Sequence, residues 1–384
     1  MQPLRDVRVL DLSRLLPGSF ASLVLADLGA RVDKLEDPLG DPLRHLPPLV
    51  GGESAIFAAL NRDKRSACLD LKKPRARRAT LAMLRRYDVI IDPFRPGVLD
   101  RLGLAHDTMR AQNPRLIVCA LTGYGQSGPL ALRAGHDINY LARAGVLGMQ
   151  GPAGAPPAPF AAQIADIGGA LWSVVAVVGA LRERDRTGQG CVLDIAMTEA
   201  SAAFAWAGIA AALAGEPPAR GGHPLSGGLA AYGAYLTKDG EVVTIGALEP
   251  KFWRAFCRGV GREADADDLR PGPHQARLEE ALRAVFASRT RAEWEAFSRE
   301  HDCCVEGALR PDELLGDEQL ASRGVFFELQ SAGGRLVQLR TPLTPRDGAH
   351  ARAPARGEHT DVVLREAGVD EGEIAAMRAD GAIA

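Results

Sequence analysis

The chain has 384 residues, which exceeds what a single hydrophobic core usually covers, so two domains are the natural expectation. Hydrophobic residues make up 46% and charged residues 24%, as in an ordinary globular protein. The formal net charge of -2 argues against nucleic acid or an anionic membrane as the main partner, because both require a basic surface.

The six cysteines predict reduced, mostly buried thiols, because none forms a C-x-x-C pair. We therefore expect neither a disulfide framework nor a zinc or other metal site. The first residues lead directly into a strand-like segment rather than a signal peptide, and the C-terminal Gly-Ala-Ile-Ala is not a peroxisomal address. The longest apolar run, 167–181, is short for a membrane span. A cytoplasmic location without membrane contact is expected.

The first elements predict a parallel sheet. A buried strand over 7–12 is followed by a Pro17-Gly18 turn, a helix over 19–28 and a second strand over 31–36. A strand, a helix and a strand at this spacing form a βαβ unit. The pattern continues with strands over 66–71, 88–92 and 116–121 and a helix over 74–86, so a doubly wound α/β domain is predicted.

This domain lacks the phosphate-binding sequences of the common nucleotide folds. No G-x-G-x-x-G follows the first strand, and no Walker sequence is present. We therefore exclude NAD and FAD as cofactors.

A proline-rich segment, 151–159, precedes the longest predicted core helix, 167–184. Asp166 occupies the position of an N-cap before that helix. One interpretation is a capping aspartate. In the other, Gly168 and Gly169 let a ligand approach the backbone N–H groups, which would hold a developing oxyanion. The two interpretations are compatible.

The second half predicts a smaller α+β domain at 229–325. A strand over 192–195 and a long Ala-rich helix over 198–214 lead into a Gly/Pro-rich stretch, and 201–228 is expected to link the domains. The smaller domain holds a hairpin around Lys238-Asp239-Gly240. Its helices are predicted over 250–259, 275–287, 291–301 and 310–321. Two short strands follow residue 324, and a tail helix is predicted over 359–367. The segment 326–384 is expected to return to the large domain, 1–200.

A run of polar and hydroxyl-bearing side chains, Gly135-His136-Asp137-Ile138-Asn139-Tyr140, stands between a glycine-rich turn, 122–129, and an apolar run, 141–149. Chemistry carried on a loop of a rigid scaffold has this pattern. A histidine beside an apolar run is also often a structural residue. Both interpretations of His136 stand at this point.

Two basic clusters, 61–66 and 72–78, and Arg95 at the end of a strand are candidate anion contacts. The second cluster has the pattern of a solvated helix face. The first, with Arg62, Lys64 and Arg65, suits a polyphosphate bound without a Walker turn, for which arginine offers planar donors. Coenzyme A would satisfy these points, although composition alone does not establish it.

These motifs together resemble the family III CoA-transferases (CaiB/BaiF-like), and within them the alpha-methylacyl-CoA racemase branch. The resemblance is carried by 11–18, 25–30, 61–66, 94–97 and 123–129, and it runs from about Val7 to the C-terminal region. It implies a large Rossmann-like domain, a small domain and two interlocked chains, with each site between the large domain of one chain and the small domain of the other.

Three segments resemble the racemase branch specifically: 135–140, Ala165-Asp166 and 246–250. The resemblance implies that His136 and Asp166 are the two acid/base groups and that Glu249 pairs with His136. Inverting a carbon beside a thioester needs a base on one face and an acid on the other, and it needs no redox cofactor. The CoA part of the substrate is expected to contact Arg62, Lys64, Arg65, Arg95, Gly135 and Tyr140.

The expected activity is epimerisation of a 2-methyl-branched acyl-CoA through an enolate. In the alternative, a CoA-transferase, Asp166 is a covalent nucleophile and His136 with Glu249 is not required. A third hypothesis, an inactive CoA-binding subunit, is disfavoured by the intact His136, Asp166 and Glu249. The sequence departs from the family at Asp37, where many members have a basic residue near the adenine, at Asp33 in a usually apolar strand, and after Cys304-Val305, where a proline is common.

Overall fold

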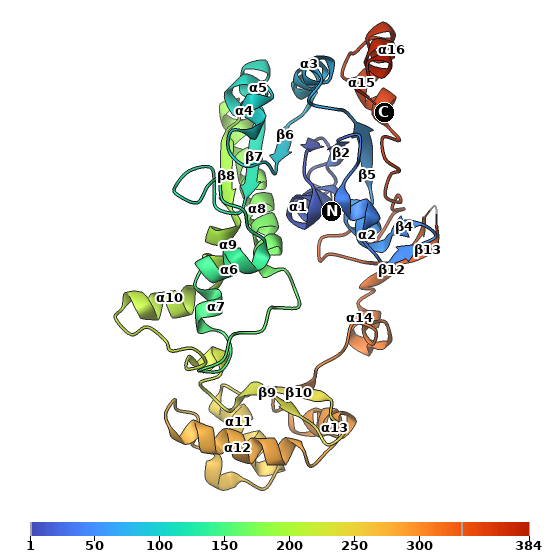
Figure 1. The fold of residues 1–384 in the computed structure, drawn as a ribbon. Coiled ribbons are helices and arrows are strands. Elements are labelled where there is room, and N and C mark those ends of the chain that lie inside the picture. The colour runs from blue at the N-terminus through green and yellow to red at the C-terminus, as the bar shows by residue number, and fades with distance from the viewer. Residues whose placement is uncertain (1, 332, 384) are drawn as a thin grey trace. The chain divides into compact units, whose positions relative to one another are not determined.

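A computed structural model describes residues 2–331 and 333–383 (Figure 1). The chain forms two compact units. Unit 1 contains the described residues up to Leu141, Ala161–Ala203 and the described residues from Glu318 onward. Unit 2 contains Ala142–Phe160 and Phe204–Asp317. The predicted continuous first domain, 1–200, differs from this division because 142–160 packs with the second unit.

Unit 1 is built on a six-stranded sheet in the order β5-β2-β1-β6-β7-β8, and every neighbouring pair is parallel. The predicted α/β fold with a parallel sheet is therefore confirmed. The chain order reverses between β1 and β6, which is the place where ligands of such sheets bind, outside the carboxyl ends of the strands. The strands are β1 Arg8–Asp11, β2 Arg31–Glu36, β5 Lys64–Cys68, β6 Val89–Asp92, β7 Ile117–Thr122 and β8 Val192–Ala196.

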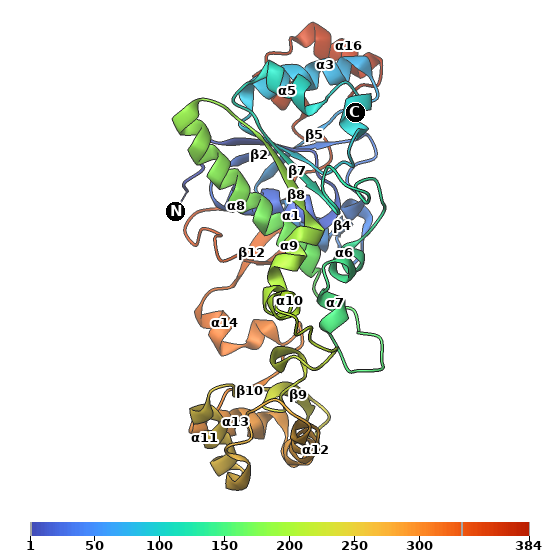
Figure 2. The ribbon, with the colours of Figure 1, turned by 90° about the vertical axis from the view of Figure 1, so that its left-hand side faces the viewer.

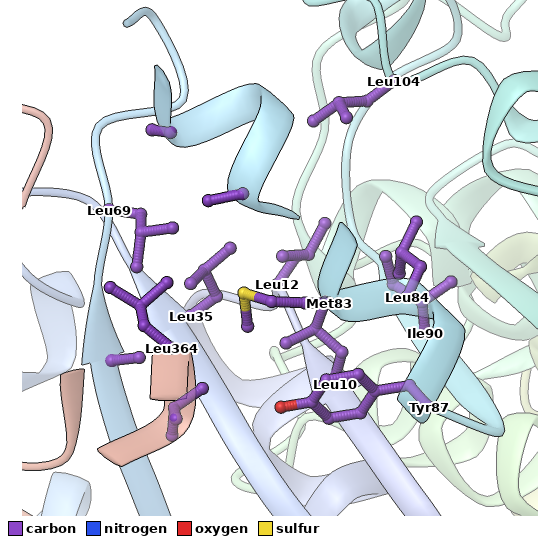
Figure 3. Packing of buried hydrophobic residues seen from close by; sticks show 14 of the residues in the cluster. Leu10, Leu12, Leu35, Leu69, Met83, Leu84, Tyr87, Ile90, Leu104 and Leu364 are labelled. Carbon is purple, nitrogen blue, oxygen red and sulfur yellow. The ribbon is translucent and has the colours of Figure 1, made fainter. Parts of the chain in front are cut away.

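Helices cover both faces of this sheet, and successive strand residues enter opposite cores, as the pleat requires. Val9 packs with α1 (Leu15–Asp27) and α8 (Ile164–Thr187). Leu10 packs on the other face with α3 (Pro74–Met83), α5 (His106–Gln112), α15 (Thr360–Glu366) and α16 (Glu371–Ala379). Figure 2 shows α8 lying along β7 and β8, and Figure 3 shows Leu10, Met83 and Leu364 in the second core.

Smaller elements complete unit 1. The C-terminal segment reaches the sheet region, where Leu69 forms a bridge with Ile383. Strands β12 and β13 pair with each other in antiparallel fashion, as do β3 and β4. The remaining elements are η1 Pro42–His45, β3 Leu49–Val50, β4 Glu53–Ser54, α2 Ala55–Asn61, η2 Leu84–Arg86, α4 Val98–Arg101, α6 Asp137–Arg143, α9 Met197–Phe204, α14 Glu318–Ser322, β12 Phe326–Ser331 and β13 Gly334–Leu339.

Two helices of unit 1 begin earlier than predicted. Helix α1 begins at Leu15, so Pro17 and Gly18 lie in its first turn rather than in a turn before it. Proline is tolerated there because the first N–H groups of a helix have no partner within the helix. Helix α8 begins at Ile164 rather than at residue 167.

Helix α8 spans 24 residues and is by length and composition apolar enough to cross a membrane. Half of its most apolar 18-residue window is buried inside the protein. Its packing on β7, β8 and α1 is that of a core helix on a sheet.

Unit 2 contains a three-stranded antiparallel sheet, β11-β10-β9, with an aromatic core in which Phe256 packs against Phe286 and Trp294. Strand β11 was not predicted. The strands are β9 Tyr232–Leu236, β10 Val242–Gly246 and β11 Val305–Gly307. The helices are α7 Val146–Met149, α10 Trp206–Leu213, η3 Pro224–Ser226, α11 Pro250–Gly259, η4 Glu263–Asp265, α12 His274–Phe286, α13 Arg291–His301 and η5 Leu314–Gly316.

The segment predicted as a linker is partly folded. The single helix predicted over 198–214 is broken at Ala205 into α9 and α10. The following stretch contacts 142–160: Gly221 N–H donates to Met149 O over 3.1 Å, and Arg220 donates to Ala155 O over 2.9 Å. The helix predicted over 310–321 is also wrong, because only the short elements η5 and α14 form there.

Candidate active site

His136 lies directly before α6, at the point where the glycine-rich turn ends. Its backbone N–H donates to Asn139 Oδ1 over 3.0 Å, and its carbonyl accepts the Asn139 N–H over 2.8 Å. These bonds hold the backbone of the turn. The His136 side chain is exposed, and its ring forms no hydrogen bond with the part of unit 1 that the structure describes. The imidazole is therefore free to meet a substrate.

Asp166 is the third residue of α8, and its predicted position as N-cap is wrong, because the N-cap is Gln163. Gln163 makes no capping bond with its side chain. The cap comes instead from Asp137, whose Oδ1 accepts the N–H of Ala165 over 2.7 Å and that of Asp166 over 3.1 Å. Gly168 lies one turn into the helix, where N–H groups bond within the helix, so it is not a suitable oxyanion donor.

The carboxyl group of Asp166 is half-buried between charged neighbours. Burial and the negative charge of Asp137 together raise its pKa from the ordinary 3.8 to about 6, and His136 opposes the change. The charge of His136 therefore acts on the Asp166 carboxyl group. A carboxyl group with a pKa near 6 exchanges protons readily near neutral pH.

Tyr140 is buried, and it is close enough to Asp166 for the charge of Asp166 to act on its pKa. Its hydroxyl donates to Gly135 O over 2.5 Å, and its ring meets the Tyr124 ring edge-on. A Cβ at Gly135 would lie 2.7 Å from the Tyr140 ring, and one at Gly123 would lie 2.3 Å from it. Glycine at both positions therefore lets the backbone pass close to the ring. Burial raises the pKa of Tyr140 to about 12, and Asp166 contributes in the same direction.

Two of the predicted CoA contacts are buried inside unit 1, and their prediction as phosphate ligands is wrong. Arg62 is fully buried and holds Asp27 with two bonds, of 2.7 and 3.0 Å. Lys64 is also buried; it donates to Ser22 Oγ over 2.7 Å and lies 3.7 Å from Asp11. Burial lowers the pKa of Lys64 to about 7. These cations neutralise internal carboxylates and do not reach a ligand.

Arg65 is committed to a half-buried network. It bonds Asp33 over 2.6 and 2.9 Å, and Asp33 also accepts the Tyr87 hydroxyl over 2.6 Å. These partners explain why an aspartate is accommodated in the apolar strand β2. Arg95, in contrast, is exposed, lines a cavity of about 470 Å³ and opposes the rise in the Tyr140 pKa.

Three cations that the sequence interpretation did not assign to CoA also face a cavity. A cavity of about 530 Å³ lies beyond the ends of β1, β2, β5 and β6, and Arg14, Lys72, Arg101 and Phe94 line it. This is the strand-order reversal of the sheet. Lys72 belongs to the cluster predicted as a solvated helix face. Arg14 and Lys72 each follow a predicted strand closely, and this position at the carboxyl end of a parallel strand was the signal that could have identified them.

Asp37 also lines this cavity, and it pairs with Arg14 over 2.8 Å. The departure from the family noted at this position therefore has a local charge partner.

Glu249 belongs to unit 2, where it is the N-cap of α11. Its side chain is exposed and, among the residues the structure describes, has no hydrogen-bond or ion-pair partner. Burial raises the pKa of the neighbouring Cys304, and the charge of Glu249 contributes in the same direction. The pairing of Glu249 with His136 stays a prediction.

The sequence matches the family described as CoA-transferase family III over residues 4–360. It is 36% identical to human alpha-methylacyl-CoA racemase, over 98% of this chain and 96% of that protein. It is 30% identical to mouse succinyl-CoA:glutarate CoA-transferase, over 100% of this chain and 91% of that protein. The crystal structure of a CAIB/BAIF family protein from Brucella suis superposes with a TM-score of 0.81 at 28% identity and covers 94% of this chain and 98% of that chain. The chain therefore belongs to CoA-transferase family III.

Proposed function

We propose that the protein epimerises the α-carbon of a 2-methyl-branched acyl-CoA by moving a proton from one face of that carbon to the other. The observation that carries the proposal is the pair formed by His136 and Asp166. The first is an exposed imidazole, and the second is a carboxyl group with a pKa raised to about 6 that responds to the charge of the first. The 36% identity to a racemase supports the same activity.

The proton balance of this pair fits a two-base mechanism. For one epimer, the Asp166 carboxylate takes the α-proton, which leaves an enolate, and protonated His136 delivers a proton to the opposite face. The product state, with neutral His136 and protonated Asp166, is the starting state for the other epimer. The pair thus holds one proton, which lies on His136 for one epimer and on Asp166 for the other. Both of these protonation states must be accessible near neutral pH.

The adenosine part of CoA is proposed to bind in the cavity at the strand ends. Arg14, Lys72 and Arg101 supply positive charge for phosphates, and the Phe94 ring supplies an apolar face. Arg95 follows Phe94 directly and acts on Tyr140, so one loop connects this cavity with the proton-transferring pair. A substrate lying across that loop would place its thioester near His136.

Glu249 is proposed to orient the His136 ring and to stabilise its protonated form, as a carboxylate does for imidazole. The lack of a hydrogen-bond or ion-pair partner for its side chain among the described residues supports this role. We propose that the two residues come from different subunits of an interlocked homodimer. Mixing His136→Ala subunits with Glu249→Gln subunits tests this: an exchange between chains restores one intact site per dimer, whereas no recovery shows that both residues come from one chain.

The experiment that tests the activity follows one epimer of a 2-methylacyl-CoA in deuterated water, with mass and chirality at the α-carbon as readouts. The wild type is compared with His136→Ala and with His45→Ala, an exposed histidine on η1 that serves as the matched control. Deuterium uptake with loss of chirality, abolished only by His136→Ala, is the expected result.

The transferase alternative has its own support in relatives that are 30–32% identical and transfer CoA between carboxylic acids by name. It predicts no deuterium uptake but movement of CoA to an added carboxylate such as succinate or glutarate. In that case Asp166→Ala would abolish the transfer and His136→Ala would not. That outcome would overturn the racemase proposal.

A further inference from the structure

Asp137 makes a contact that the proton-transfer chemistry does not by itself require. It is the first residue of α6, is half-buried and directly follows His136 in the chain. Its Oδ1 accepts two backbone N–H groups in the first turn of α8, those of Ala165 and Asp166. A carboxylate of one helix thus caps the N-terminus of another, in place of the N-cap residue Gln163.

This contact connects His136 with Asp166 through one covalent neighbour and one hydrogen bond. His136 is the covalent neighbour of Asp137, and the backbone amide of Asp166 is the direct hydrogen-bond partner of its carboxylate. The chain between Asp137 and Asp166 leaves unit 1 on the way, because 142–160 belongs to unit 2. The bond between Asn139 Oδ1 and the His136 N–H fixes the other side of the turn.

We propose that Asp137 is a positioning residue that holds the backbone of Asp166 against the loop that carries His136, and so fixes the spacing of the two groups. The inference rests on the proposed function, because spacing matters only when both groups act on one carbon. Misplacement of a reacting group by about 1 Å can cost about 100-fold in rate. The bond lengths of 2.7 and 3.1 Å are those of a formed cap.

The same carboxylate shapes the charge around Asp166. An aspartate in the first turn of a helix is ordinarily stabilised as an anion by free N–H groups and the helix dipole. Here Asp137 occupies two of those N–H groups and adds its own negative charge. The titratable groups that act on the Asp166 pKa are Asp137 and His136. Asp137 works together with burial to raise it, whereas His136 opposes the rise. Asp166 in turn contributes to the raised pKa of Tyr140.

Two substitutions separate geometry from charge. Asp137→Asn keeps an oxygen that accepts the two N–H groups but removes the charge, whereas Asp137→Ala removes both. We expect Asp137→Ala to lower kcat for α-proton exchange about 100-fold with little change in KM, since Asp137 does not line the cavity proposed to bind the adenosine part of CoA. We expect Asp137→Asn to retain kcat within about tenfold and to move the acidic limb of the pH–rate profile to lower pH. The matched control is Asp107→Ala, an exposed aspartate in the first turn of α5.

A second readout does not depend on activity. Hydrogen–deuterium exchange of the Ala165 and Asp166 amides should be slow in the wild type and in Asp137→Asn, and at least tenfold faster in Asp137→Ala. Unchanged protection in a folded Asp137→Ala protein would overturn the proposal, as would kcat within twofold of the wild type. If the wild type shows no α-proton exchange at all, the proposed function fails, and the amide protection still decides whether Asp137 is the cap.

Discussion

Replacing Asp166 by asparagine is expected to stabilise the folded protein at pH 8 while removing its activity. Burial raises the Asp166 pKa from 3.8 to about 6. As pH rises through the window between these two values, the unfolded chain loses its proton before the folded chain does. The folded state then binds more protons than the unfolded state, so stability falls with rising pH and the loss is complete above about pH 6.

The size of the effect follows from the shift. A difference of about two pKa units corresponds to about 3 kcal/mol. Asp166 is only half-buried, so solvent screening reduces the expected value to about 1–2 kcal/mol. Asparagine cannot ionise and does not suffer this loss. Its advantage over the wild type should therefore be largest above pH 6 and about half as large at pH 5.

Urea denaturation followed by tryptophan fluorescence provides the assay. Trp172 lies on α8, the same helix as Asp166, and reports on the unfolding of that helix. All tryptophans are the same in both proteins, so the two unfolding curves can be compared directly. Asp107→Asn, on α5, is the control and should show no such gain. A substituted protein that is no more stable than the wild type at pH 8, or whose advantage does not grow between pH 5 and pH 7, would refute the reasoning.

Four further substitutions test the roles of single residues. Arg62→Met should cost about 3–5 kcal/mol in the free energy of unfolding, because it leaves a fully buried aspartate unpaired. Arg101→Ala should instead raise KM for acyl-CoA and leave the denaturation midpoint unchanged. If Arg62→Met raised KM without a loss of stability and Arg101→Ala did not raise KM, Arg62 rather than Arg101 would be the CoA contact. Gly123→Ala should destabilise by about 1–3 kcal/mol and lower kcat, since its Cβ would lie 2.3 Å from the Tyr140 ring; unchanged kinetics and melting would contradict that contact. Glu249→Gln should lower kcat with the unfolding free energy within about 0.5 kcal/mol of the wild type, and a large loss of stability would indicate a structural role instead.

The sign of the Asp166 effect connects stability with function. Groups placed for catalysis are often held in environments that do not suit the fold, and their removal then stabilises the protein. The burial and the Asp137 charge that bring the Asp166 pKa closer to neutral pH, as the proposed function requires, are the same two causes that destabilise its anion. The Arg62–Asp27 pair shows the opposite arrangement, with a charge fully matched by its partner.

The sequence by itself determined the class of fold and many of its elements, because those depend on local patterns. Runs of apolar residues separated by helices predicted the parallel sheet, and helices α11 and α13 have the predicted bounds. Both begin with strong local signals, Pro250 at the first position of α11 and a capping box from Thr290 to Glu293 in α13. His136 and Asp166 were identified by motif, and in the structure the charge of His136 acts on the Asp166 carboxyl group.

Only the tertiary structure decided which charges are free and which are used internally. A basic run has the same composition whether it faces solvent or the core, so the burial of Arg62 and Lys64 could not be predicted from 61–66 alone. Their partners Asp27 and Asp11 are distant in the chain, and burial requires that charges be paired. The cap on α8 was hidden for the same reason: Asp137 reaches it across 28 positions of sequence, and no local rule for helix starts describes such a contact.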